Sequence, residues 1–169
     1  MTKKLNYYLI TLFVFGNSII KFRGTWASLF TTLFLFSVIH IFGISIQIVS
    51  LLFLIILFYS YFAIKSCLND FKDDDPQEIV IDEFVGQSIP IILYEFFHSD
   101  LTNLSVETLQ FYFWFFLFFR LFDGLKPFPI DYIDKSFKNA FGILFDDVLA
   151  GIYVVLCFIL FMVGKTFFI

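Results

Sequence analysis

No charged residue occurs between Trp26 and Ile64. A single helix of that length would extend for roughly 58 Å at about 1.5 Å per residue, whereas the hydrocarbon core of a bilayer is about 30 Å thick. We therefore expect two membrane crossings here, joined by a turn near His40 to Ser45, around Gly43. The whole chain is 60% hydrophobic with 29 Phe among 169 residues, which is outside the range of soluble domains. It is predicted to be an integral membrane protein.

Further apolar runs predict an all-α, polytopic membrane helical bundle with about five spanning or partly spanning helices. The expected spans are residues 26–41, 44–64, 82–98, 105–122 and 146–164. The segment 65–78, with its acidic run from Asp73 to Asp75, is expected to be a solvated loop. We expect residues 1–169 to form one integral-membrane domain.

The lysines and arginines predict the orientation of this bundle. If the N-terminus is cytoplasmic, all of them except Lys165 lie inside or at the inner boundary, as the positive-inside rule favours. The segment Leu5 to Ile20 has lysines on both sides, so both of its ends must lie on the cytoplasmic side of the membrane. We therefore expect an N-terminal interfacial or re-entrant helix.

Five carboxylates fall on the cytoplasmic face in this topology. Asp82 and Glu83 open the third span, Asp123 closes the fourth, and Asp146 and Asp147 open the fifth. Acidic residues favour the first turn of a helix, so capping would explain four of them one at a time. It does not explain Asp123, which lies at the far end of its apolar run. Because carboxylates beside hydrocarbon are costly, the cluster indicates a functional site.

Such carboxylates would repel one another unless they were protonated or neutralised by a cation. Hard oxygen ligands suit Mg²⁺, Mn²⁺ or Ca²⁺, and the lack of clustered His and Cys argues against zinc. Adjacent residues on a helix point about 100° apart. We therefore expect one member of each adjacent pair to bind the ion, while the other supports it, binds a second ion or acts on water. Small residues one turn after each pair, Gly86 and then Ala150 with Gly151, would let the helices approach closely.

A cationic motif surrounds Asp123. Arg120, Asp123 and Lys126 are spaced i, i+3 and i+6 on a helix that Pro127 ends. Taken alone, the trio predicts a snorkelling helix end with an internal salt bridge. Beside the other carboxylates it indicates an anion site with a metal ligand embedded in it, because Arg binds phosphate oxygens bidentately and Lys supplies a compact charge.

A second cationic stretch lies just before the first span. Arg23, Thr25 and Ser28 could bind a phosphate at a helix N-terminus. This signal is weak by itself, because Thr25 could equally be the N-cap of the helix.

Taken together, these motifs resemble the phosphatidylglycerophosphatase A family of small bacterial inner-membrane lipid phosphatases. The matching text is Asp75-Pro76, Ile79 to Gly86, Phe119-Arg120 through Asp123 to Pro129, Gly142-Ile143, Asp146-Asp147 and Ala150-Gly151. Two stretches depart from the family pattern. Arg23 and Ala27 replace a proline and a glycine of the N-terminal motif, and Asn139-Ala140 replaces a glycine pair.

The resemblance implies Mg²⁺-dependent removal of the terminal phosphate from phosphatidylglycerophosphate, giving phosphatidylglycerol for phospholipid biosynthesis. The predicted catalytic and metal-binding residues are Asp82, Glu83, Asp123, Asp146 and Asp147, and the predicted phosphate-binding residues are Arg120, Lys126, Arg23, Thr25 and Ser28. We expect a multi-pass protein of the bacterial inner membrane whose active site faces the cytoplasm. Its expected partners are the lipid substrate and the membrane, with no nucleic acid; the sequence leaves the oligomeric state open.

Other functions fit the sequence less well. A cation-coupled transporter would carry its carboxylates near the bilayer midplane, often in repeated halves, whereas here they lie at one edge and no repeat is seen. A lipid phosphotransferase would need a dense Asp-rich motif that this chain lacks, and a noncatalytic membrane scaffold gives no reason for five carboxylates on one face. Cysteine-based phosphatase chemistry is excluded because neither Cys67 nor Cys157 is followed six positions later by Arg.

Overall fold

The computed structural model of this chain describes residues 2–13, 15–16, 21–73, 76–98 and 106–168. Every regular element in these residues is helical, so the all-α prediction is confirmed. The helices are α1 (Thr2–Ile10), α2 (Arg23–Phe36), α3 (Ile46–Cys67), α4 (Ile81–Phe97), α5 (Val106–Leu125), α6 (Ile130–Ser136) and α7 (Ala140–Phe168). A π-helical stretch, Ser37–Ile41, continues α2, and a 3-10 turn, Leu68–Asp70, continues α3.

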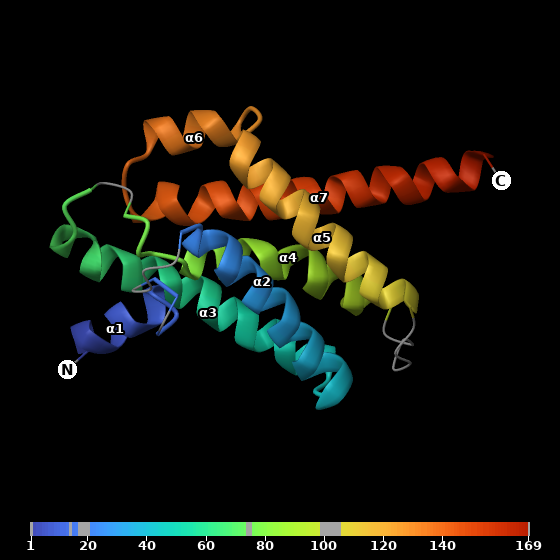
Figure 1. The fold of residues 1–169 in the computed structure, drawn as a ribbon, viewed down its shortest axis with the longest axis horizontal. Coiled ribbons are helices and arrows are strands. Elements are labelled where there is room, and N and C mark those ends of the chain that lie inside the picture. The colour runs from blue at the N-terminus through green and yellow to red at the C-terminus, as the bar shows by residue number, and fades with distance from the viewer. Residues whose placement is uncertain (1, 14, 17–20, 74–75, 99–105, 169) are drawn as a thin grey trace.

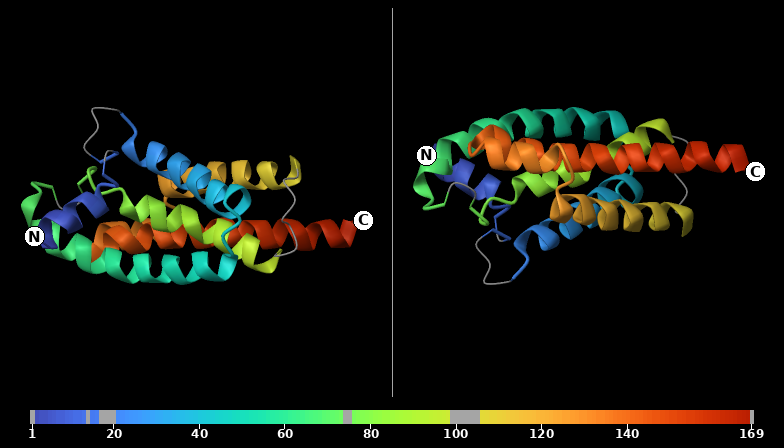
Figure 2. Two further views of the ribbon diagram at one scale, coloured as in Figure 1. Left: turned by 90° about the horizontal axis from the view of Figure 1, so that it is seen from below. Right: turned by 90° about the horizontal axis from the view of Figure 1, so that it is seen from above.

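Helix α4 occupies the centre of the bundle. In the two views of Figure 2, α2 and α5 lie on one side of the bundle and α3 on the other, and α4 crosses α7 between them. Helix α4 contacts all four of these helices. The close approach of α4 and α7 requires small residues. A Cβ at Gly86 would collide with the backbone of Asp147, and a Cβ at Gly151 would collide with the backbone of Gly86. The expectation that these glycines permit close helix packing is confirmed.

Helices α2 and α3 form a hairpin from the long uncharged stretch. The turn between them contains Gly43 at φ +64, a left-handed conformation that glycine adopts without strain. Its position agrees with the predicted turn. Side chains along the outside of α3, including Leu51, Ile55 and Phe58, are exposed although they are apolar. This pattern suits a helix whose outer face contacts lipid.

Three helical segments of the described chain are long and apolar enough to cross a membrane. They are Arg23–Ile41, Ile46–Asp70 and Ala140–Lys165, and they correspond to the first, second and fifth predicted spans. Helices α4 and α5 lie at the third and fourth predicted spans but fall outside this group. The count of five spans therefore stays a prediction.

The N-terminal helix is shorter than expected. We predicted a helix over Leu5 to Ile20, but α1 ends at Ile10, and residues 11–13 and 15–16 form turns. Ile10 is fully buried, and its carbonyl accepts a hydrogen bond from the backbone N–H of Val80, so tertiary packing ends the helix here. Residues 17–20 lie outside the described part of the chain, and a re-entrant path for this segment stays a prediction.

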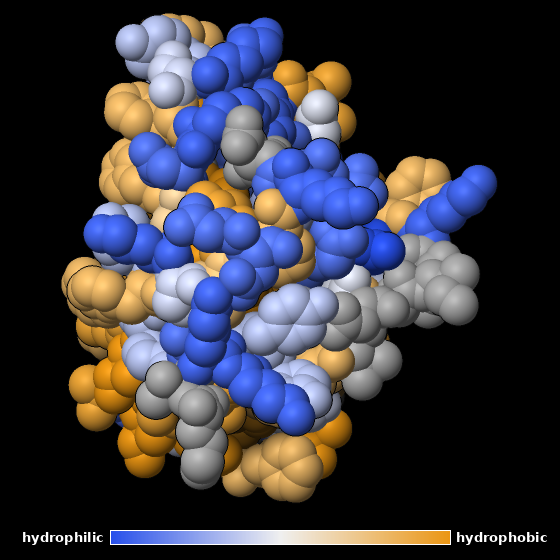
Figure 3. Space-filling model, turned by 90° about the vertical axis from the view of Figure 1, so that its left-hand side faces the viewer, coloured by the Kyte–Doolittle hydropathy of each residue, from blue (hydrophilic) through white to orange (hydrophobic). Residues whose placement is uncertain are grey.

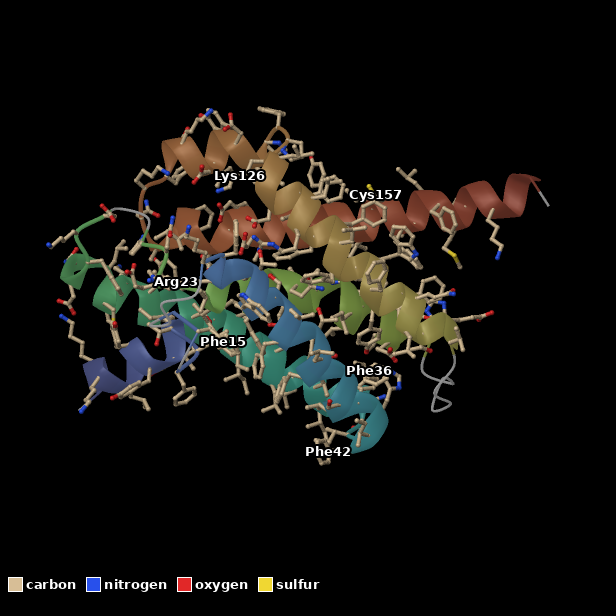
Figure 4. The ribbon with its side chains drawn as sticks, viewed as in Figure 1. Phe15, Arg23, Phe36, Phe42, Lys126 and Cys157 are labelled. Carbon is tan, nitrogen blue, oxygen red and sulfur yellow. The ribbon has the colours of Figure 1, made fainter. Side chains whose placement is uncertain are left out.

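The two ends of the bundle differ in polarity. Figure 1 shows that α2, α4 and α7 begin, and α5 ends, toward the end where α1 and α6 lie. Figure 3 shows hydrophilic side chains gathered across that end. Arg23 and Lys126 lie toward it, whereas Phe36 and Phe42 lie toward the opposite end (Figure 4). We call the end with α1 and α6 the polar end.

The segment predicted as a loop after the second span is partly helical. Helix α3 continues past Lys65 to Cys67, and the 3-10 turn extends it to Asp70. Asp73 is exposed, as expected of a solvated acidic run. Asp74 and Asp75, also predicted to be solvated, lie outside the described residues.

Candidate active site

Carboxylates from the starts of two helices meet at the polar end. Asp82 and Glu83 lie in the first turn of α4, and Asp147 lies in the second turn of α7. One carboxylate oxygen from each of these three residues lies within 4.8 Å of the other two. Asp147 is buried, and Asp82 and Glu83 are partly buried. The glycine contacts between α4 and α7 bring these side chains together from positions far apart in the sequence.

This geometry differs from one expectation. We expected only one member of each adjacent pair to reach a common point, yet Asp82 and Glu83 both do so. Asp82 folds back, because its Oδ1 accepts a hydrogen bond from the Glu83 backbone N–H at 3.1 Å. The second pair does divide as expected, since Asp147 joins the cluster while Asp146 turns to Lys126.

The end of α5 lies beside the carboxylate cluster and contributes Arg120 and Asp123 to the candidate site. Arg120 Nη1 lies 2.9 Å from Asp123 Oδ2, so the predicted internal salt bridge is present. The Asp123 carboxyl lies close enough to the Asp147 carboxyl for their negative charges to repel each other. Arg120 Nη1 donates a further hydrogen bond to Ser28 Oγ of α2, at 3.2 Å. A guanidinium beside this many carboxylates offsets part of their charge and still presents donors to an anion.

Lys126 takes a different course from the helical trio that the sequence predicted. It lies just after α5, before Pro127, with φ at +42. Its Nζ lies 2.8 Å from Asp146 Oδ2 and 3.3 Å from Asp134 Oδ1. Burial alone lowers the pKa of Lys126, but the hydrogen bond and charge of Asp146, together with the charges of Asp134 and Asp123, outweigh burial and raise the pKa above its usual value.

Sequence reasoning missed Asp134. It lies on α6, where Lys138 Nζ is 3.1 Å from its Oδ1. Partial burial raises the pKa of Asp134, but the hydrogen bond from Lys138 and the charge of Lys126 outweigh burial and lower the pKa. The i, i+4 spacing of Asp134 and Lys138 is typical of an ordinary surface ion pair. Only the folded structure shows that α6 packs back over Lys126.

The N-terminal cationic stretch is also near the cluster. A Cβ at Gly24 would collide with Oε1 of Glu83, so the first turn of α2 packs directly on this carboxylate. Arg23 Nη1 lies 3.2 Å from Glu78 Oε1, a partner that the sequence analysis did not identify. Thr25 is not the N-cap: Phe22 holds that position in a left-handed conformation, and α2 begins at Arg23.

Ser28 is fully buried and serves the helix packing. Its hydroxyl donates to the carbonyl of Gly24 at 2.9 Å and accepts from Arg120. The structure thus brings together the predicted carboxylates, Arg120, Lys126 and the start of α2. The chemical roles of these residues stay predictions.

The carboxylate cluster has the chemistry of a site for a hard cation. All its ligand atoms are carboxylate oxygens, which suit Mg²⁺, Mn²⁺ or Ca²⁺. Oε2 of Glu83 is buried and has no hydrogen-bond partner within the residues the structure covers. An unpaired buried carboxylate oxygen is costly, and a divalent ion would satisfy it. The residues present therefore fit such an ion.

A family model and two named relatives identify the family of this chain. The model of the family described as phosphatidylglycerophosphatase A matches residues 8–162. A protein named phosphatidylglycerophosphatase A from Haemophilus influenzae is 37% identical over 145 residues, covering 84% of this chain and 80% of the relative. The Escherichia coli protein of the same name is 31% identical over 84 residues, 50% of this chain and 43% of the relative.

A third relative carries a different name. A Bacteroides thetaiotaomicron protein, provisionally named a phosphatidylinositol-3-phosphatase, is 33% identical over 94 residues, 53% of this chain and 48% of the relative. No solved structure matches the chain significantly.

Proposed function

Since this chain belongs to the phosphatidylglycerophosphatase A family, we propose that it hydrolyses the terminal phosphate monoester of phosphatidylglycerophosphate in a Mg²⁺-dependent reaction. The products are phosphatidylglycerol and inorganic phosphate. One observation supports this most strongly: carboxylates from α4 and α7 meet beside the guanidinium of Arg120 at the polar end of an apolar bundle. That arrangement suits a lipid substrate whose phosphate binds at the membrane surface while its acyl chains stay in the bilayer.

The cationic residues bind the phosphate in this proposal. Arg120 donates to the phosphate oxygens from the centre of the site, and Lys126 supplies a positive charge from the edge that α6 covers. Both positive charges stabilise the transition state more than the ground state, because negative charge develops on the phosphoryl group as it is transferred. The first turn of α2, with Arg23 and Thr25, can add backbone N–H donors, since Gly24 already places that turn against Glu83.

The carboxylates orient the attacking water. Its oxygen forms a bond to phosphorus while the bond from phosphorus to the glycerol oxygen breaks, and the glycerol oxygen receives a proton. Asp82, Glu83 and Asp147 are placed to accept the proton that the water loses, with Asp123 holding Arg120 beside them. A bound Mg²⁺ would offset the negative charges of the carboxylates and the phosphate, and would make water a better nucleophile.

The location of the protein follows from the same argument. The bacterial inner membrane is the expected compartment, with residues 1–169 acting as one domain. The polar end would face the cytoplasm, because in the predicted topology every lysine and arginine except Lys165 lies inside or at the inner boundary.

Substrate identity is tested with purified protein in detergent. Phosphatidylglycerophosphate, phosphatidate and phosphatidylinositol 3-phosphate are each supplied with Mg²⁺, released phosphate is measured, and the lipid product is identified by mass. We expect phosphatidylglycerophosphate to give the highest kcat/KM and phosphatidylglycerol as product. Faster hydrolysis of either comparison lipid would contradict the proposed substrate, and no release from any lipid would contradict phosphatase activity.

A further inference from the structure

Gln87 is the most unusual polar residue of the central helix. Its side chain is fully buried, yet neither Oε1 nor Nε2 has a hydrogen-bond partner among the residues that the structure describes. Two other buried side chains, the hydroxyls of Ser88 on α4 and Thr31 on α2, are by contrast satisfied within their own helices. Ser88 donates to the carbonyl of Phe84 at 2.6 Å, and Thr31 donates to that of Ala27 at 2.8 Å. A buried, unpaired amide is costly, so its retention in the apolar centre of the bundle indicates a function.

The position of Gln87 relates it to the carboxylate cluster. It follows Glu83 by four residues on α4, so the two side chains share one face of the helix about 6 Å apart along the axis. Side chains on a helix lean toward its N-terminus, which directs the amide toward Glu83. Glu83 Oε2 is itself unpaired. The unpaired polar atoms of Glu83 and Gln87 thus lie one helical turn apart on α4, with Gln87 farther from the polar end.

The chemistry of an amide indicates the kind of group it binds. Gln87 offers one acceptor oxygen and an NH₂ donor, which together complement a hydroxyl that both donates and accepts. In phosphatidylglycerophosphate, the carbon next to the one bearing the terminal phosphate carries a free hydroxyl. With the phosphate bound by Arg120 beside the carboxylate cluster, this hydroxyl would lie a few bond lengths away, which is comparable to one helical turn.

We propose that Gln87 binds the glycerol hydroxyl of the substrate and thereby selects lipids that carry it. This inference rests on the proposed function. The phosphate itself is a poorer match for a neutral amide than for Arg120, and acyl chains need no polar partner. Because the amide is fully covered, the side chains packed over it must part when the headgroup binds. A site built to pair a hydroxyl discriminates against analogues that lack it, since the buried amide is then left unsatisfied.

The test combines a change in the residue with a change in the substrate. The analogue is the same lipid with the glycerol hydroxyl replaced by hydrogen, and the variant is Gln87→Met, which keeps the length of the side chain but removes both polar atoms. We expect wild type to prefer phosphatidylglycerophosphate by about 10- to 100-fold in kcat/KM. Gln87→Met should hydrolyse both lipids at similar kcat/KM. Ser88→Ala, a buried neighbour whose hydroxyl is paired within α4, should keep the wild-type preference.

Thermal unfolding in detergent separates binding from a structural role. If Gln87 has no partner in the fold, Gln87→Met should unfold, without lipid, at a temperature no lower than wild type. A lower Tm, an equal loss of kcat/KM on both lipids, or a wild type that does not distinguish them would overturn the inference and leave the proposed function standing. Absence of phosphate release from both lipids by wild type would instead contradict the proposed function, and the inference with it.

Discussion

Lys126 Nζ lies 2.8 Å from Oδ2 of Asp146, so the cation that follows α5 is bound to the second turn of α7. Asp134 of α6 approaches the same Nζ at 3.3 Å. One ammonium group therefore connects three helices at the edge of the candidate active site. This arrangement holds a positive charge where the proposed phosphate would bind, and it also supports the local fold.

Replacing Lys126 should test its role in phosphate binding. Lys126→Met keeps much of the apolar stem but removes the charge, and we expect kcat/KM for the lipid to fall by about 100-fold at saturating Mg²⁺. The control is Lys135→Met, because Lys135 forms an exposed pair with Asp131. Steady-state phosphate release measures both. A Lys126→Met enzyme with wild-type kcat/KM would remove Lys126 from the phosphate site.

The pair between Asp134 and Lys126 predicts a pH dependence of stability. The pKa of Asp134 is lowered in the fold, so its contribution is present above the unfolded value of 3.8 and is lost as pH falls through the folded value. The pKa of Lys126 is raised, so its contribution is present below the unfolded value of 10.5 and is lost only as pH rises through the folded one. We expect Asp134→Asn to lower Tm between these limits and to match wild type at the acidic end. A Tm difference unchanged at low pH would argue against the ion pair.

Asp123 should matter for catalysis rather than for charge balance alone. Its Oδ2 lies 2.9 Å from Arg120 Nη1, so it holds the proposed phosphate-binding guanidinium beside the carboxylate cluster. Asp123→Asn keeps the size of the side chain, and we expect kcat to fall by about 10- to 100-fold and the Mg²⁺ requirement to change. Asp73→Asn, on the exposed segment after α3, is the matched control and should behave as wild type. Loss of activity in Asp73→Asn together with wild-type activity in Asp123→Asn would mean that the active site lies elsewhere.

The orientation of the bundle can be measured by cysteine labelling. Native Cys67 is unsuitable because its side chain is fully buried. We expect a cysteine at position 73, in the Asp73→Cys variant with Cys157→Ser, to react in spheroplasts with membrane-permeant maleimides only. A cysteine at position 165, in the last turn of α7 and so at the end of that helix away from the polar end, should react with impermeant maleimide. The opposite pattern would invert the proposed topology.

The sequence predicted the general position of the site because charges in this chain are rare. Carboxylates beside long apolar runs fall at helix ends, and the positive-inside rule places those ends on one face. Glycine spacing likewise indicated that α4 and α7 pack closely, and Gly86 and Gly151 do so. These features depend on local pattern, so one sequence suffices to find them.

Other features depend on how helices pack and had no local signal. Asp134 reaches Lys126 only because α6 returns over the end of α5. Carboxylate oxygens of Asp82 and Glu83 lie within 4.8 Å of each other and of Asp147, which the angle between neighbouring helical positions did not predict. The early end of α1 at Ile10 follows from packing against α3 and Val80. Gln87 did have a sequence signal, because it is an amide one turn after Glu83 within an apolar run. Only its burial without a hydrogen-bond partner among the described residues indicates a binding role.

The metal dependence of phosphate release from phosphatidylglycerophosphate tests the central claim most directly. Purified wild-type protein is stripped with EDTA, assayed, and assayed again after Mg²⁺ is restored, beside Asp147→Asn and the exposed control Asp131→Asn. We predict that EDTA abolishes release, that Mg²⁺ restores it in wild type and in Asp131→Asn, and that Asp147→Asn stays inactive. Full activity after metal removal, or a wild-type rate in Asp147→Asn, would contradict a metal-dependent site built on these carboxylates.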